Sequence, residues 1–268
     1  MSVVRAPARL LRETGARAWR TGSDRRDRTL AGARPGTADA DQRGVASLGD
    51  DLTTREAAAT TVATWPPAEI VAACSSALRH LDARQLESLG VTSTLRGEGR
   101  SVVAAAMAAV LAREYGRRTL LVELDLESPA LARRTELDTT PGVAEVVRGE
   151  QSLYGCIRWR DDGLGLLSAG DARGAAPDLL GRIPASGLLA QLVGSADVVV
   201  ADLPPLAPAA SGAPLANRCA EVLLVVRAGV TPLGDLRRAL EALARPPTVI
   251  LNGLRPALPP LLRAVLGA

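Results

Sequence analysis

The fold of this chain is restricted above all by short runs of Val, Leu and Ile that alternate with helical segments. Several runs contain no polar residue, as expected for strands that are covered on both faces. This alternation predicts a three-layer α/β domain with a mostly parallel central sheet. We predict strands at 88–93, 119–124, 164–168, 197–202, 221–227 and 248–252, and helices at 68–81, 101–115 and 232–244, the last with Thr231 as its N-cap.

Composition excludes several classes of protein. Of the 268 residues, 47% are apolar and 23% are charged, which is ordinary for a globular chain and unlike a disordered or collagenous one. Aromatic residues make up 2%, so a base-stacking surface is not expected and nucleic-acid binding is not favoured. No apolar run is long enough for a transmembrane segment. The three cysteines lack metal-ligand spacing and indicate a reducing compartment, so we expect a cytoplasmic protein.

The chain divides at the turn formed by Trp65-Pro66-Pro67. Residues 1–64 are rich in Arg, Gly, Asp and Thr without apolar periodicity, and we expect a flexible Arg-rich extension there. Residues 65–268 form the predicted domain. All 32 basic side chains are Arg, because the chain contains no Lys. Any site that ordinarily uses an ammonium group must therefore use a guanidinium.

A glycine-containing loop between the first strand and the next helix is the most informative local feature. The segment Val91–Ser101 reads Val-Thr-Ser-Thr-Leu-Arg-Gly-Glu-Gly-Arg-Ser. Such a loop can turn its amides toward phosphate oxygens, and a hydroxyl at Ser101 could reach Mg²⁺. The strict phosphate-loop pattern, however, has Gly at position 94 and Lys at position 100, where this chain has Thr and Arg. Glycine turns also end strands for purely structural reasons, so the motif alone leaves nucleotide binding open.

Carboxylates follow two further predicted strands. Glu123 and Asp125 lie at the end of the second strand, and Asp202 ends the run Asp197–Asp202. Ligands of open parallel sheets bind at the carboxyl ends of the strands, where such acids can hold Mg²⁺. Any one of them could instead be a turn or capping residue.

Together these segments resemble the cytoplasmic catalytic domain of bacterial tyrosine autokinases of polysaccharide assembly, relatives of the MinD and ParA ATPases. The family's Thr-Ser-x-x-Pro-Gly-Glu-Gly-Lys-Ser is similar to residues 92–101, its Asp-x-Asp-Leu-Arg-x-Pro to residues 123–129, and its Asp-x-Pro-Pro to residues 202–205. The resemblance covers about residues 66–255 and implies a P-loop NTPase fold.

The resemblance also implies ligands and roles for individual residues. It implies ATP and Mg²⁺ as cofactors, a membrane protein of polysaccharide assembly as partner, and catalytic roles for Arg100, Asp125 and Asp202. Homo-oligomerisation is left open, because the first helix lacks the family's Glu-x-x-Arg-x-x-Arg pattern. The implied phosphate-lining residues are Gly97, Glu98, Gly99, Arg100 and Ser101; the residues near the base are Arg227 and Asn252; the metal-binding residues are Ser101, Glu123, Asp125 and Asp202.

Several departures from the family pattern bear on activity. Arg100 replaces Lys, Glu123 replaces Asp, and Glu127 reverses the charge of the family Arg. The last tyrosine is Tyr154, so the family's C-terminal tyrosine cluster is not expected. Because phosphoryl transfer depends on positioned charge, we favour an ATP-Mg-binding regulator with reduced or lost kinase activity.

Three alternatives remain. The first is an active ATPase or protein kinase that uses Arg100 in place of Lys. The second is a positioning ATPase of the MinD or ParA type, against which Leu95 stands where those proteins carry an additional lysine. The third is a scaffold that binds no nucleotide.

Overall fold

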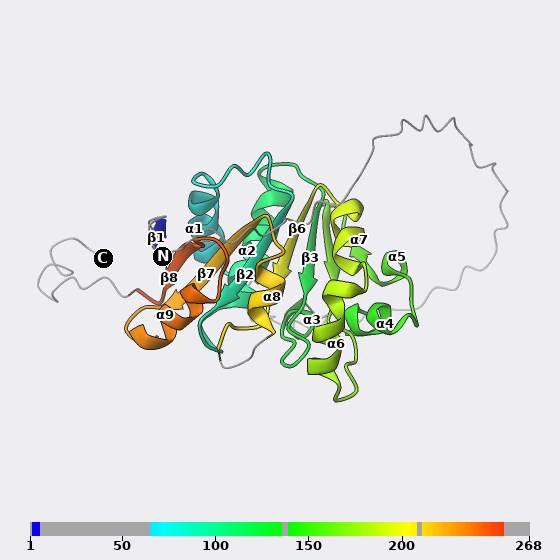
Figure 1. The fold of residues 1–268 in the computed structure, drawn as a ribbon. Helices are drawn as coiled ribbons and strands as arrows, with labels where there is room; N and C mark the ends of the chain where they lie inside the picture. Colours follow the sequence, from blue (N-terminus) through cyan, green and yellow to red (C-terminus); the bar gives the residue numbers. More distant parts are fainter. Residues whose placement is uncertain (1, 6–64, 136–138, 208–210, 255–268) are drawn as a thin grey trace, which may run out of the picture. The chain divides into compact units, whose positions relative to one another are not determined.

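The computed structural model describes residues 2–5, 65–135, 139–207 and 211–254, which form a sheet and the helices around it (Figure 1). The strands are β1 Ser2–Arg5, β2 Ser88–Ser93, β3 Thr119–Glu123, β4 Arg158–Trp159, β5 Leu164–Leu167, β6 Val198–Asp202, β7 Glu221–Arg227 and β8 Thr248–Asn252. The helices are α1 Ala68–Leu78, α2 Arg100–Arg113, α3 Leu131–Thr135, α4 Val143–Arg148, α5 Leu153–Cys156, α6 Ala176–Arg182, the 3₁₀ turn η2 Ile183–Ala185, α7 Leu188–Ser195, α8 Gly212–Ala216 and α9 Leu233–Glu241.

The strands form one sheet in the order β1-β8-β7-β2-β6-β3-β5-β4. The six inner strands run parallel, while β1 and β4 pair antiparallel with β8 and β5 at the two edges. Strand β2 lies between β7 and β6, and β6 lies between β2 and β3. The carboxyl ends of β2, β3 and β6 therefore meet at the same edge of the sheet, which places their terminal loops side by side.

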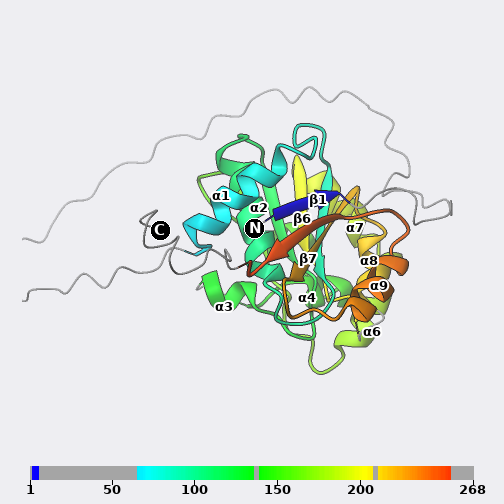
Figure 2. The same cartoon turned by 90° about the vertical axis from the view of Figure 1, so that its left-hand side faces the viewer.

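Helices cover both faces of the sheet, as the unbroken apolar strands predict (Figures 1 and 2). Residues alternate along β6: Val198 and Val200 pack with α1 and α2, whereas Val199 and Ala201 pack with the core under α4 to α9. Each of these four side chains is at most 1% exposed. The predicted three-layer α/β fold with a mostly parallel sheet is confirmed.

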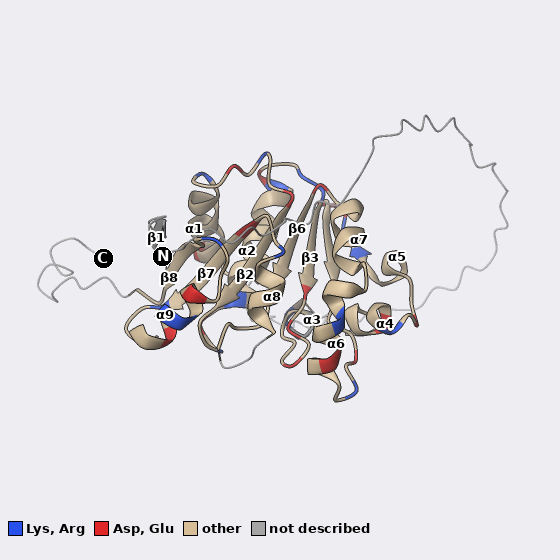
Figure 3. Ribbon diagram, in the orientation of Figure 1, with Lys and Arg blue, Asp and Glu red and all other residues tan. Residues whose placement is uncertain are grey.

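Charged residues of the inner strands lie only at the strand ends (Figure 3). Glu123 ends β3, Asp202 ends β6, and Glu221 and Arg227 begin and end β7. Strand interiors that are covered on both faces cannot hold an unpaired charge without a large loss of solvation energy. Glu123 and Asp202 therefore lie at the carboxyl edge of the sheet, where β2 also ends.

Helix α2 is buried on nearly all sides. Every residue from Val103 to Ala112 is buried, because α2 packs between the sheet and α1. The numerous alanines of α2 explain this burial, since small side chains allow close packing of a helix against elements on opposite sides. Helices that are apolar all round are expected in such interior positions.

Two edge strands and one helix cap differ from the sequence-based expectations. Ser2–Arg5, which we placed in the extension, forms β1, and the short β4 was not predicted. Residues 6–64 lie outside the described residues, so the flexible extension stays a prediction. The expected N-cap role of Thr231 is wrong: α9 has Pro232 at that position with no side-chain cap, and the Thr231 hydroxyl donates to Glu98.

None of the helices in the described ranges has the length and apolarity needed to span a bilayer.

The buried position of α2 generates a stability prediction. Leu111 is 0% exposed, and Leu111→Ala should lower the free energy of unfolding by about 2–5 kcal/mol because it leaves a cavity between α2 and its neighbours. Leu233, which is 81% exposed, is the matched control, and Leu233→Ala should change the free energy of unfolding by less than about 0.5 kcal/mol. Urea denaturation measures both values. Equal effects of the two substitutions would contradict this packing.

Candidate functional site

The loop at residues 94–99 joins the end of β2 to the start of α2. Gly97 and Gly99 have φ angles of 83° and 94°, which other residues adopt only with strain. The Gly99 carbonyl accepts a hydrogen bond from the Val103 amide at 3.1 Å and so begins the helix. A Cβ atom at residue 99 would lie 2.3 Å from Asn252 Nδ2. Both backbone conformation and neighbouring atoms therefore favour glycine at position 99.

Glu98 ties this loop to the ends of β7 and β8. Its side chain is 3% exposed, and its Oε2 accepts from the Leu95 amide at 2.9 Å. Its Oε1 accepts from the Thr231 hydroxyl, and its backbone carbonyl accepts from Asn252 Nδ2 at 2.9 Å. The loop is thus braced from inside and from two neighbouring strands, which gives it a defined conformation.

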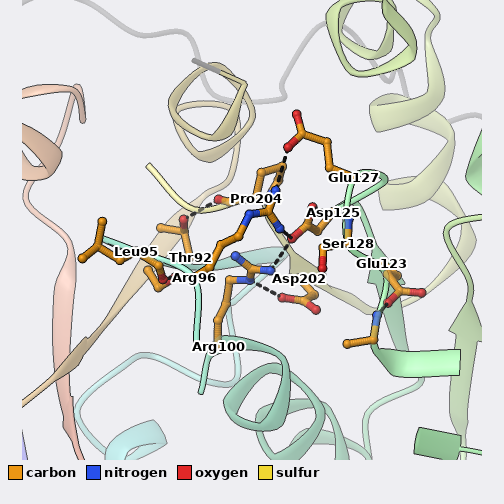
Figure 4. Close-up of polar contacts among 12 residues, drawn as sticks. Thr92, Leu95, Arg96, Arg100, Glu123, Asp125, Glu127, Ser128, Asp202 and Pro204 are labelled. Carbon is orange, nitrogen blue, oxygen red and sulfur yellow. Dashed lines mark hydrogen bonds and ion pairs between the residues drawn. The ribbon is translucent and has the colours of Figure 1, made fainter. Parts of the chain in front are cut away.

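Arg100 lies between two buried carboxylates, as Figure 4 shows. Its Nε donates to Asp202 Oδ1 at 2.9 Å, and its Nη2 donates to Asp125 Oδ2 at 2.5 Å. Arg100 is 9% exposed, and the two aspartates are 1% exposed. Buried charges are retained only when they are paired and hydrogen-bonded. The guanidinium therefore bridges the ends of β3 and β6 and holds both acids.

Burial changes the acidity of Asp202. Loss of solvent raises the pKa of Asp202 to about 6, although Arg100 and a hydrogen bond with the Ser101 side chain both lower it. The negative charge of Glu123 raises it slightly further. Ser101 thus contacts Asp202, as expected for a residue at the start of α2 that faces the end of β6.

Glu123 does not share a binding position with the aspartates. Its Oε1 accepts from the backbone amides of Ala130 and Leu131, the second at 2.6 Å, and its Oε2 accepts from the Ala169 amide at 3.3 Å. These bonds fix the loop between β3 and α3. Within the described ranges, no three His, Cys, Asp or Glu side chains lie close enough to hold one metal ion.

Arg96 forms a second contact with the same acids, which the sequence motifs did not predict. Its Nη1 lies 3.3 Å from Asp125 Oδ2, and its Nη2 lies 2.6 Å from Glu127 Oε2. Arg96 occupies the position of the family Pro, and Glu127 the position of the family Arg. The exchange of Pro for Arg at 96 together with that of Arg for Glu at 127 could have indicated this ion pair, because a new carboxylate at 127 favours a cation nearby.

Of the two residues expected near a nucleotide base, Asn252 and Arg227, one contacts the glycine loop through its side chain and the other does not. Asn252 contacts the loop through Glu98, whereas the Arg227 side chain is exposed at the end of β7. The Arg227 amide donates to the Thr231 hydroxyl oxygen at 3.1 Å, so its backbone is linked to the loop through Thr231. The structure therefore brings the loop residues, Ser101, Asp125 and Asp202 together, with Asn252 beside them.

Two polar atoms of the loop region have no partner among the described residues. Arg100 Nη1 and Thr94 Oγ1 are both buried and both lack a hydrogen bond. Figure 4 shows the other two nitrogens of Arg100 with their bonds to Asp125 and Asp202 and the third without one. Buried donors without partners are uncommon in folded proteins, and each calls for an explanation.

Comparisons with known proteins place this site in a family. No protein-family model matches the chain. Tyrosine-protein kinase YwqD of Bacillus subtilis is 28% identical over 172 residues, which are 64% of this chain and 72% of YwqD. Succinoglycan biosynthesis transport protein ExoP of Rhizobium meliloti is 32% identical over 174 residues, which are 63% of this chain and 22% of ExoP. The crystal structure of the VpsO kinase domain has a TM-score of 0.62 and 32% identity, over 70% of this chain and 94% of that domain.

The sheet, the glycine loop and the acids at the strand ends define a domain with the P-loop NTPase fold. The similarity to the VpsO kinase domain and to YwqD narrows this class, and the chain belongs to the family of bacterial tyrosine-kinase domains of polysaccharide assembly. It spans most of YwqD but only about a fifth of ExoP.

The arrangement of the acids does not fit the magnesium ion that the family implies. Mg²⁺ is bound by carboxylate oxygens together with water, and it demands near-octahedral geometry. Here Asp125 and Asp202 already hold the permanently charged guanidinium of Arg100 between them. Ser101 hydrogen-bonds Asp202, and Glu123 faces backbone amides instead. A cation could use these oxygens only after Arg100 had moved away.

The close approach of Gly99 to Asn252 generates a second prediction. Gly99→Ala should lower the free energy of unfolding by more than about 1 kcal/mol, because it adds backbone strain and displaces the Asn252 amide. In an Asn252→Ala background the same substitution should be less harmful, since its Cβ then has space. A double-mutant cycle from urea denaturation measures this coupling. Additive effects of the two substitutions would show that they do not touch.

The raised pKa of Asp202 predicts a pH dependence of stability. Between about pH 4 and pH 6 the folded state binds more protons than the unfolded state, because the folded pKa is the higher one. The contribution of Asp202 to the free energy of unfolding is therefore largest below about pH 4 and declines as the pH rises through 6. The free energy of unfolding of the wild type, minus that of Asp202→Asn, should fall by roughly 2–3 kcal/mol between acidic and neutral pH. A difference that stays level or rises with pH would contradict this assignment.

Proposed function

We propose that this protein is a regulatory member of the polysaccharide-assembly tyrosine-kinase family, which binds a nucleotide at the loop but has lost or strongly reduced phosphoryl transfer. One observation carries the proposal: two of the three nitrogens of Arg100 bond to Asp125 and Asp202, so its guanidinium is fixed by these acids and cannot follow a phosphate through the reaction. A lysine at this position presents a compact ammonium, whereas a guanidinium is planar and makes directed, forked bonds. The two carboxylates match that fork.

Loss of activity follows from the physics of phosphoryl transfer. The reaction is accelerated almost entirely by positive charge positioned around the phosphate, because the protein itself takes little part in bond making and breaking. Removing one preorganised electrostatic contact costs about 10²- to 10³-fold in rate. In this site the basic residue and both acids are occupied by one another, and Glu123 is occupied by backbone amides. Several charged groups that could accelerate phosphoryl transfer are thus engaged elsewhere at the same time.

The partner is part of the same proposal. ExoP, which shares 32% identity with this chain, is by its name a transport protein of succinoglycan biosynthesis. We infer that this chain acts on a membrane protein of polysaccharide assembly from a cytoplasmic location. An active kinase or ATPase that uses Arg100 directly is the competing function, and activity assays separate the two.

A comparison of phosphate release tests this proposal. The wild-type chain, incubated with ATP and Mg²⁺, should release phosphate no faster than Asp202→Asn, because the wild-type site has no free carboxylate at this position. Tyrosine phosphorylation of the chain, followed with labelled ATP, should also be equal in the two proteins. Wild-type rates clearly above those of Asp202→Asn would contradict the proposal and favour the active enzyme. Exposed Arg237→Lys serves as the control for handling and folding.

A further inference from the structure

We propose that the loop binds a diphosphate-bearing ligand without a divalent cation. The guanidinium of Arg100 lies between the two aspartates where a divalent cation would bind, and it supplies the positive charge in place of that cation. The inference rests on the proposed nucleotide site and specifies its ligand: free nucleotide or pyrophosphate, and not the magnesium complex. Three features of the site support it.

The first feature is the pairing of both acids with Arg100. In a phosphate site of this kind the acids at the ends of β3 and β6 are available for a metal ion. Here both carboxylates are 1% exposed and bond to one guanidinium at 2.5 and 2.9 Å. Breaking such a buried pair leaves an uncompensated charge, which is strongly unfavourable. A divalent cation must therefore displace a well-bound group before it can enter.

The second feature is the pair of unused polar atoms beside the loop. Arg100 has five N–H donors, and its third nitrogen, Nη1, is buried without a partner. Thr94, which is 0% exposed, has a hydroxyl in the same condition. Thr94 begins the loop after β2 and Arg100 begins the 14-residue α2, where loop amides and the helix N-terminus also favour an anion. In this proposal a phosphate group at the start of α2 accepts hydrogen bonds from both atoms.

The third feature is space and local charge. A Cβ atom at Gly97 would meet nothing within 4 Å, so the loop has room above it. Arg96 and Arg100 face three acids, Asp125, Glu127 and Asp202, which gives a formal charge of −1. Net charge therefore does not attract the ligand, and directed donors must do so. Since Arg100 provides one positive charge where Mg²⁺ would provide two, we expect binding to be weaker than in a metal-dependent site.

Calorimetric titration of the full chain tests the inference directly. ADP and pyrophosphate are titrated separately, each once in excess EDTA and once in excess Mg²⁺. We expect the affinity in EDTA to equal or exceed the affinity in Mg²⁺. If ADP binds more tightly than pyrophosphate, the ligand is a nucleotide; equal affinities indicate that the diphosphate group alone is recognised.

A second measurement does not depend on any variant. The electron paramagnetic resonance signal of free Mn²⁺ should be unchanged by the wild-type chain with or without pyrophosphate, beyond the amount that pyrophosphate itself removes. Loss of the free Mn²⁺ signal on addition of protein would overturn the inference.

Substitution of Arg100 connects the binding to this side chain. Arg100→Lys should weaken binding of pyrophosphate in EDTA by roughly 10- to 100-fold, the effect of losing one charge-assisted hydrogen bond. Arg237→Lys, on the exposed side of α9, should leave it unchanged. Circular dichroism establishes that each variant is folded. Unchanged binding by folded Arg100→Lys would overturn the assignment to Arg100.

The outcomes distinguish this inference from the proposed function. Binding that needs Mg²⁺, without turnover of ATP, would overturn the inference and leave the regulatory function standing. Turnover of ATP together with binding in EDTA would contradict the proposed function alone. Absence of binding by both probes under both conditions would overturn both.

Discussion

The ion pair between Arg100 and the two buried aspartates is the interaction on which the character of this site depends. It joins the start of α2 to the ends of β3 and β6, three elements that a P-loop fold brings together around its ligand. The fold is that of a family of kinase domains, but the charged groups at its centre are satisfied by one another. A site whose charges are already paired has less to offer to a reacting phosphate, and this is the physical basis of the proposed regulatory role.

Other changes agree with this arrangement. The exchange of charge at 96 and 127 produces a second ion pair, which also reaches Asp125. Glu123, one methylene longer than the family Asp, turns away from the aspartates and fixes the backbone after β3. Glu98 braces the loop against Thr231 and Asn252. The three substituted residues, and Glu98 that the family also has, hold the protein's own structure, while Arg100 Nη1 and Thr94 Oγ1 stay unpaired.

Much of the fold could be predicted from the sequence, because its periodic features are local. Strands β2, β7 and β8 have the predicted bounds, and β3, β5 and β6 differ by one residue at one end. Strands β1 and β4 were missed, since each is short and depends on an edge partner elsewhere in the chain. The residues of the site were predicted from motifs, but their contacts were not. Whether Arg100 faces a ligand or an aspartate depends on competing interactions of similar strength, and a motif contains no information about that balance.

The strength of the coupling between Arg100 and Asp202 tests the central claim most directly. A double-mutant cycle with Arg100→Met and Asp202→Asn, measured by urea denaturation at neutral pH, gives the interaction energy of the pair. If the guanidinium is held by this carboxylate, the two substitutions should be non-additive by about 1–3 kcal/mol, with the double variant more stable than the sum of the single effects predicts. Additivity within about 0.5 kcal/mol would show that Arg100 and Asp202 are independent, and their ion pair could then not be the interaction that organises the site.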